Sequence, residues 1–156
     1  MSERYEPPSD FLKSIIADEV PVTGGHFAET NLNKLIEHTR DTDRANRDWA
    51  TLLLSHEGGD SPAVRAALLQ AAHDDDDVIR AEAVLGLASR DPEVALPFVQ
   101  EALRAEVITA PMLEAAAICA HRSLIADLQI WAEPSEETVL DRLAAQALAA
   151  CLSTVR

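Results

Sequence analysis

The chain has 156 residues, and its 27 Asp and Glu outnumber its 13 Lys and Arg, which gives a formal net charge of −14. A protein that grips nucleic acid or an anionic membrane surface needs a basic face, so both kinds of partner are disfavoured. Aromatic residues make up only 4%, whereas the chain holds 27 Ala and 19 Leu. This composition favours closely packed helices and argues against a β-sandwich or barrel.

No apolar run approaches the roughly 18 residues that a membrane-spanning helix needs. The first residues, Met1 to Pro8, lack the apolar core of a signal peptide. Cys119 and Cys151 stand singly in alanine-rich segments, without the spacing of a metal site or a redox pair. We therefore expect a cytoplasmic protein with no metal and no cofactor.

Residues 1–27 differ from the rest and are predicted to form an N-terminal arm or irregular cap, because prolines and glycines interrupt them. One short apolar segment, Phe11 to Ala17, predicts a brief helix that Ser9 or Asp10 caps. Residues 28–156 are predicted to form a single repeat domain.

From about residue 30 the apolar residues follow helical spacing, as Val64, Ala67, Leu68 and Ala71 illustrate. Four breaks end in a capping residue or a first-turn proline: 58–62, 74–77, 90–92 and 133–135. The pattern predicts helices of about 10 to 14 residues joined by short links, which is typical of helical hairpins.

One sequence pattern recurs at a period of about 33 residues. Arg47 and Ala50 correspond to Arg80 and Ala83, and further copies begin at Met112 and Leu140. The alignment places these alanines in one shared position: Ala50, Ala83, Ala117 and Ala145. Between the copies lie predicted second helices at about 62–72, 92–104 and 123–131. Such two-helix units bury their apolar faces only by stacking on neighbours.

The segment Asp77 to Pro92, Asp-Val-Ile-Arg-Ala-Glu-Ala-Val-Leu-Gly-Leu-Ala-Ser-Arg-Asp-Pro, resembles the HEAT-like repeat of phycobilisome lyases. Asp43 to Leu54 is a second copy, and the resemblance extends over about 41–131, with 136–152 as a partial unit. The resemblance implies an all-α, right-handed superhelix (a HEAT-like solenoid) of about four helical hairpins. It implies no single function, because such repeats occur in bilin lyases, DNA-repair glycosylases and small proteins that bind other proteins.

Two acid–arginine pairs, Asp43 with Arg47 and Asp76 with Arg80, recur at the repeat period. We predict that each acid caps a helix and each arginine bonds the neighbouring repeat. The run 73–77, which holds four consecutive aspartates, lacks the alternating spacing of a calcium loop. It is predicted to be a solvated turn, and a docking patch for a basic partner remains the alternative.

Four further side chains carry expectations. Trp49 stands where Glu82 stands one repeat later, so it either anchors an interface or packs under the N-terminal arm. Cys119 is predicted to lie in the core and Cys151 to be more exposed. His121 is predicted to be a partly buried residue at a helix end.

No catalytic motif is recognisable, so we predict a non-catalytic module that binds a protein partner through a curved face lined by the second helices. The acidic net charge suits a basic partner. The predicted contact residues are Trp49, Arg65, Gln70, Asp74, Asp75, Glu93, Gln100 and Asp127. Two alternatives stay open. One is an acidic inhibitor or immunity-type protein for a basic target. The other is a bilin-lyase-like enzyme, which the acidic balance disfavours.

Overall fold

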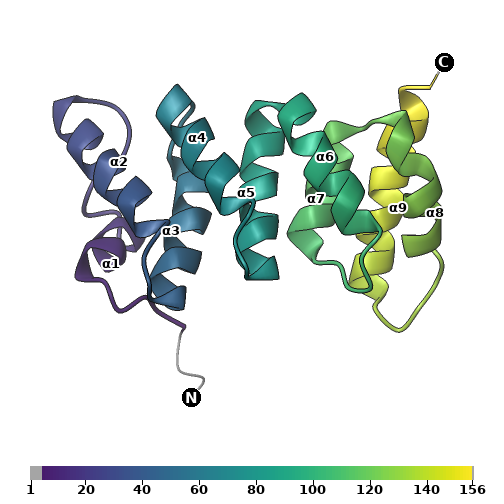
Figure 1. Cartoon of the computed structure of the whole chain (residues 1–156), viewed down its shortest axis with the longest axis horizontal. Helices are drawn as coiled ribbons and strands as arrows, with labels where there is room; N and C mark the ends of the chain where they lie inside the picture. The colour runs from purple at the N-terminus through teal and green to yellow at the C-terminus, as the bar shows by residue number, and fades with distance from the viewer. Residues whose placement is uncertain (1–4, 156) are drawn as a thin grey trace. The chain divides into compact units, whose positions relative to one another are not determined.

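The computed structural model describes residues 5–155, which form α-helices and one short 3-10 helix, with no strand among them (Figure 1). Residues 1–4 of the predicted arm, and Arg156, lie outside the described residues. The helices are α1 (Asp10–Ile16), α2 (His26–His38), α3 (Arg44–Glu57), α4 (Pro62–Ala71), α5 (Asp77–Arg90), α6 (Pro92–Leu103), α7 (Ala110–Cys119), η1 (Arg122–Leu124), α8 (Ile125–Trp131) and α9 (Thr138–Ser153). The predicted all-α fold and the three predicted second helices are confirmed.

The chain divides after Ala83 into two compact units, which are described separately. In the first unit, α1 and α2 pack against α3, and α3 packs against α4. The hydroxyl of Ser9 accepts a hydrogen bond from the N–H of Leu12 and caps α1, as the sequence predicts. Leu12 and Ile15 bury the inner face of this short helix.

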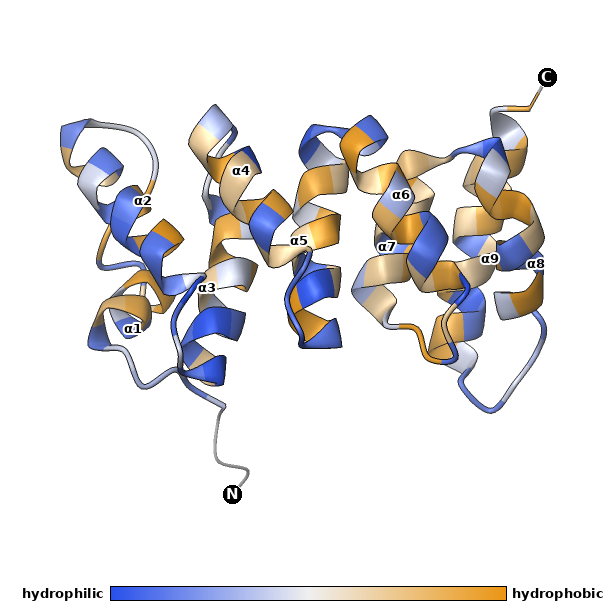
Figure 2. Ribbon diagram, viewed as in Figure 1, coloured by the Kyte–Doolittle hydropathy of each residue, from blue (hydrophilic) through white to orange (hydrophobic). Residues whose placement is uncertain are grey.

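Aspartates begin the helices α3 and α5. The Asp43 carboxylate accepts from the N–H of Asn46 at 3.0 Å, and the Asp76 carboxylate accepts from the N–H groups of Val78 and Ile79 at 2.9 and 3.2 Å. Each carboxylate satisfies N–H groups that have no partner inside the helix. The predicted capping role of both acids is confirmed. Figure 2 shows hydrophilic residues gathered on the first turns of α3.

In the second unit, α7 packs against α6 and α9, and α9 also packs against α8. The indole Nε1 of Trp131 donates to the carbonyl of Leu103 at 2.8 Å, and its ring is half-buried. Among the described residues, no helix is both long enough and apolar enough to span a membrane.

The shared alanine position is correct in the first two copies and shifted by one residue in the others. Ala50 and Ala83 are fully buried. In the third and fourth copies the structure buries Ala116 and Ala144, whereas Ala117 is half-buried and Ala145 is exposed. The third copy has Glu114 where the first two copies have arginine, so its alignment lacks this marker of register. In α9 the buried face runs through Ala144, Ala147 and Cys151.

Predictions for two cysteines and one histidine are wrong. Cys151 is buried, because it continues the inner face of α9, and Cys119 is half-buried in the last turn of α7. His121 is exposed. Helix α7 ends at Cys119, and the left-handed conformation of its C-cap residue Ala120, with a φ of 46°, turns the chain away from the helix before the histidine. His121 instead accepts from the N–H of Ser123 and caps η1.

Candidate functional site

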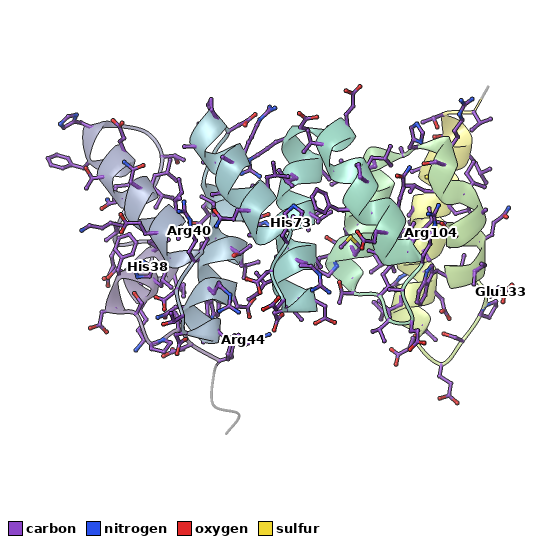
Figure 3. The ribbon with its side chains drawn as sticks, in the orientation of Figure 1. His38, Arg40, Arg44, His73, Arg104 and Glu133 are labelled. Atoms are coloured by element: carbon purple, nitrogen blue, oxygen red, sulfur yellow. The ribbon has the colours of Figure 1, made fainter. Side chains whose placement is uncertain are left out.

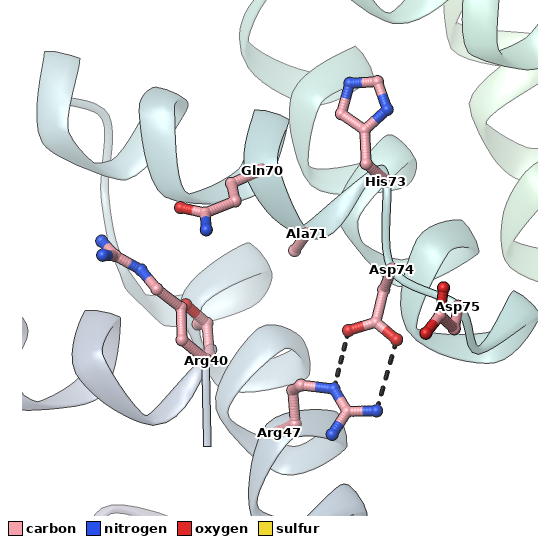
Figure 4. Close-up of a pocket in the computed structure, with 8 residues that line it drawn as sticks. Arg40, Arg47, Gln70, Ala71, His73, Asp74 and Asp75 are labelled. Atoms are coloured by element: carbon pink, nitrogen blue, oxygen red, sulfur yellow. Dashed lines mark hydrogen bonds and ion pairs between the residues drawn. The ribbon is translucent and has the colours of Figure 1, made fainter. Parts of the chain in front are cut away.

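An open hollow of about 460 Å³ lies in the first unit (Figure 4). Four parts of the chain form its wall: the residues after α2, one side chain of α3, the end of α4, and the loop that leads to α5. The lining residues are Thr39, Arg40, Arg47, Gln70, Ala71, His73, Asp74 and Asp75. Three of the predicted contact residues, Gln70, Asp74 and Asp75, therefore come together here.

Helix ends bring these residues together. At the end of α2 the hydroxyl of Thr39 donates to the carbonyl of Ile36 at 2.6 Å, which satisfies one of the last carbonyls of the helix. At the end of α4 the N–H of His73 donates to the carbonyl of Gln70 at 3.1 Å, and the chain then leaves the helix. Both ends open onto the side of α3 that carries Arg47.

The floor of the hollow is an ion pair between Arg47 and Asp74. Nε and Nη2 of Arg47 donate to the two carboxylate oxygens of Asp74 at 2.7 and 3.3 Å, which Figure 4 marks with dashed lines. The side chains are only 20% and 11% exposed. The hydrogen bond to Asp74 raises the pKa of Arg47 above its ordinary value. The predicted bond from Arg47 to the neighbouring repeat is confirmed.

Asp74 also organises the loop that follows it. Its Oδ1 accepts the N–H of Asp76 at 2.9 Å, and Asp76 in turn pairs with Arg44 of α3 at 2.7 Å. Figure 3 labels Arg44, the first residue of α3. The bond from Arg44 lowers the pKa of the Asp76 carboxyl. Arg80 differs from its prediction, because it donates to the carbonyls of Asp74 and Asp75 in the loop before its own helix.

The rim of the hollow differs from its floor, because its charged groups face solvent. Arg40, Gln70, His73 and Asp75 are exposed, and Figure 4 shows the guanidinium of Arg40 facing the side chain of Gln70. Within residues 5–155, no ion pair engages the guanidinium of Arg40 or the carboxylate of Asp75. The rim thus presents one positive and one negative group above a neutralised floor. Sequence reasoning missed Arg40 and His73, since no pattern links the end of α2 to the end of α4.

The other predicted contact residues in the first unit lie outside the lining of the hollow. Arg65 holds both carboxylate oxygens of Asp60 at 2.7 and 2.8 Å. The ring of Trp49 stacks on that of Tyr5, with centroids 6.2 Å apart and planes inclined by 23°. Trp49 therefore packs under the N-terminal segment, which is one of the two alternatives that the sequence left open.

Three predicted contact residues belong to the second unit. Glu93 is exposed in the first turn of α6. The amide of Gln100 donates to the hydroxyl of Ser123 at 2.8 Å, and Asp127 lies 3.5 Å from Arg104. Across the described part of the chain, no group of three or more His, Cys, Asp or Glu is arranged to hold a metal ion.

Comparison with known proteins identifies the class. The family model of HEAT repeats matches residues 32–119, which is more than half of the chain, so the chain belongs to the HEAT-repeat family. No curated protein sequence matches it.

Two solved structures share the fold. The X-ray structure of YibA from E. coli aligns with a TM-score of 0.62 and 20% identity, over 76% of this chain and 43% of YibA. The structure of human deoxyhypusine hydroxylase in complex with glycerol aligns with a TM-score of 0.57 and 21% identity, over 90% of this chain and 53% of the hydroxylase. The chain thus spans about half the length of these proteins. At such low identity the likeness demonstrates the fold alone.

Proposed function

We propose that the chain is a non-catalytic module that binds a protein partner, and that the hollow in its first unit receives part of that partner. The observation that carries the proposal is the rim of the hollow. Arg40 and Asp75 offer opposite charges to solvent, and Gln70 adds an amide that both donates and accepts. Membership of a family of stacked helical hairpins supports the proposal, because such repeats build extended binding surfaces.

The charges indicate which part of the hollow selects the partner. Arg47 and Asp74 already satisfy each other on the floor, so a partner gains little from them. The rim groups remain hydrated until a partner replaces their water. A segment with a basic group for Asp75 and a carbonyl or carboxylate for Arg40 fits this arrangement. The net charge of −14 would speed the approach of a basic partner.

The proposal is tested with one charge reversal at the rim and a matched reversal elsewhere. The full chain is used to capture proteins from its native extract, and each captured protein is then purified. Its affinity is measured by calorimetry for the wild type, for Asp75→Lys and for Glu114→Lys. Glu114 is an exposed residue of α7, so both variants change the net charge equally.

We expect Asp75→Lys to weaken binding at least tenfold, because it replaces the carboxylate that would meet the partner's basic group with a cation. Glu114→Lys should change the affinity less than twofold. Equal affinities for all three proteins would contradict a role for the hollow.

The acidic net charge favours a second candidate, an inhibitor of a basic target. In that case the whole surface would attract the target, so Asp75→Lys and Glu114→Lys should weaken binding by similar factors. The affinity should also collapse when salt shortens the Debye length from about 10 Å at 0.1 M to about 3 Å at 1 M. Binding that is insensitive to salt would remove this candidate.

We also propose that the protein works in the cytoplasm. Both cysteines are free thiols, which a reducing compartment preserves. Fractionation of cells that express a tagged full chain tests this location.

A further inference from the structure

The chain's own N-terminal segment, residues 5–9, lies against α3 outside any helix. Three contacts with side chains of α3 hold it there. The ring of Tyr5 stacks on Trp49, Nη1 of Arg44 donates to the phenol oxygen of Tyr5 at 2.9 Å, and the backbone N–H of Ser9 donates to Oδ1 of Asn46 at 2.9 Å. Together these contacts resemble the way a protein surface binds a linear peptide. An aromatic side chain of the segment stacks on the surface, and a backbone N–H donates to an acceptor that the surface holds in place.

The acceptor on α3 is held in place before the segment arrives. Asn46 is 8% exposed, its Nδ2 donates to Asp41 at 3.2 Å, and its backbone N–H is bonded to Asp43 at 3.0 Å. Because Nδ2 is the donor in this pair, Oδ1 is left to accept a main-chain N–H. An acceptor held this way loses little freedom when a peptide binds.

A second fixed group receives the Ser9 side chain. Nδ1 of His38 lies 3.1 Å from the carbonyl of Lys34, and this contact requires the proton on Nδ1. Nε2 of the same ring lies 3.0 Å from the hydroxyl of Ser9, and the two groups form a hydrogen bond. The surface thus forms hydrogen bonds with both the backbone and the side chain of Ser9.

The segment fills this surface incompletely. Tyr5 remains 50% exposed. The indole Nε1 of Trp49 is buried, and no acceptor for it exists among the residues that the structure describes. A buried donor without an acceptor is unusual in folded proteins and marks a place where a further group would bind. A ligand with a carbonyl at this point would satisfy a bond that the chain's own segment leaves open.

The segment can also leave without unfolding the helix that follows it. Helix α1 is fixed to the first unit by the buried side chains of Leu12 and Ile15, which belong to the helix and not to the segment. Residues 5–8 carry no regular secondary structure. Release of residues 5–8 breaks the stacking and the bond from Arg44 and exposes Pro7, which is buried, whereas release of Ser9 also removes the cap of α1.

We infer that the surface of α3 formed by Arg44, Asn46 and Trp49 is a peptide-binding site that the chain's own segment 5–9 occupies. Its ligand in trans is a partner's extended peptide with an aromatic residue, then proline, then a free main-chain N–H, in the order of Tyr-Glu-Pro-Pro-Ser. The segment acts as a tethered competitor for this ligand. This site does not include any residue that lines the hollow, so it stands apart from the proposed function.

The test uses the full chain and a synthetic peptide of residues 5–10, acetylated and amidated. ¹⁵N NMR follows the indole N–H signals of the chain's two tryptophans. The Trp131 signal is an internal reference, because its N–H is bonded to Leu103 in the second unit. In the variant Tyr5→Ala we expect the Trp49 signal to move away from its wild-type position, and the added peptide to return it in a saturable manner.

The wild type should bind the same peptide at least tenfold more weakly, because a site that its own segment fills for about nine-tenths of the time lowers the apparent affinity about tenfold. A peptide with Ala in place of Tyr should bind neither protein. The variant Arg44→Ala removes the donor to the phenol oxygen from the site itself, so it should release the segment and should also bind the added peptide more weakly than Tyr5→Ala does.

Several results would overturn the inference. One is a Trp49 signal that stays at its wild-type position in both variants. Another is a signal that moves but does not respond to the peptide at millimolar concentration. Equal affinity of wild type and Tyr5→Ala would place the peptide elsewhere. A dimer that forms with rising protein concentration and disappears in Tyr5→Ala would show that the occupant in trans is a second copy's segment rather than a partner's.

Discussion

The ion pair between Arg47 and Asp74 allows a direct test of how burial sets the strength of a two-pronged salt bridge. The first unit holds a second two-pronged pair, between Arg65 and Asp60, with N–O distances of 2.7 and 2.8 Å. The two pairs differ in exposure. The side chains of Arg47 and Asp74 are 20% and 11% exposed, and those of Arg65 and Asp60 are 42% and 48% exposed.

The expected magnitudes follow from this difference. Exposed pairs contribute about 0.2–1 kcal/mol, because water screens the charges and the long side chains lose freedom. Hydrogen bonds to charged groups that are shielded from water contribute about 1.5–3 kcal/mol. We therefore expect a coupling energy of about 2 kcal/mol for Arg47 with Asp74, and below about 1 kcal/mol for Arg65 with Asp60.

Double-mutant cycles with alanine measure both values by urea unfolding, followed by circular dichroism at 222 nm. Removal of Asp74 also breaks its bond to the N–H of Asp76, but this loss occurs in both arms of the cycle and cancels. For a chain of this length, each kcal/mol corresponds to roughly 2–4 °C in Tm. Equal coupling energies for the two pairs, or a larger value for the exposed one, would refute the reasoning.

Three further predictions concern the repeat register and two titrating groups. Ala144→Leu should destabilise the protein by about 1–3 kcal/mol, because it overpacks a fully buried position. Ala145→Leu should cost less than about 0.5 kcal/mol, because this position is exposed. Similar losses of stability in urea unfolding would contradict the register. Burial raises the pKa of the Asp48 carboxyl, so its ionised form is disfavoured in the folded protein and Asp48→Asn should raise the free energy of unfolding at pH 7. That gain should vanish as the pH falls through the raised pKa and the wild-type carboxyl takes up a proton, and a gain that grows toward acid pH would oppose this sign. Burial raises the pKa of the Cys119 thiol to about 11, so little of the reactive thiolate is present at pH 8. Cys119 should therefore react with an aromatic disulfide reagent roughly 200-fold more slowly than a free cysteine. A rate equal to that of free cysteine would contradict the burial.

The sequence predicted the helices well because each one carries its own signals. Ser9, Asp43 and Asp76 cap the helices that they were expected to cap, since capping depends on neighbours two or three residues away. The register of the third and fourth copies was wrong, because the face that a helix buries depends on the packing of α7 and α9. No local pattern recorded that packing.

The candidate site was predicted only in part, for a similar reason. Gln70, Asp74 and Asp75 lie close together in the sequence, and the sequence predicts all three as contact residues. Arg40, which it does not predict, follows α2, thirty residues before Gln70. The stacking of Tyr5 on Trp49 joins residues more than forty positions apart. Long-range pairs of this kind carry no periodic signal, so only the fold reveals them.

The four consecutive aspartates at the start of α5 are chemically identical, yet each has a different role in the structure. Asp74 clamps an arginine, Asp75 faces solvent at the rim, Asp76 holds a helix start and a second arginine, and Asp77 opens the helix. A library that randomises these positions should therefore tolerate few substitutions at Asp74 and Asp76 and many at Asp75 and Asp77. Homopolymeric runs of this type can thus store position-specific information that composition alone conceals.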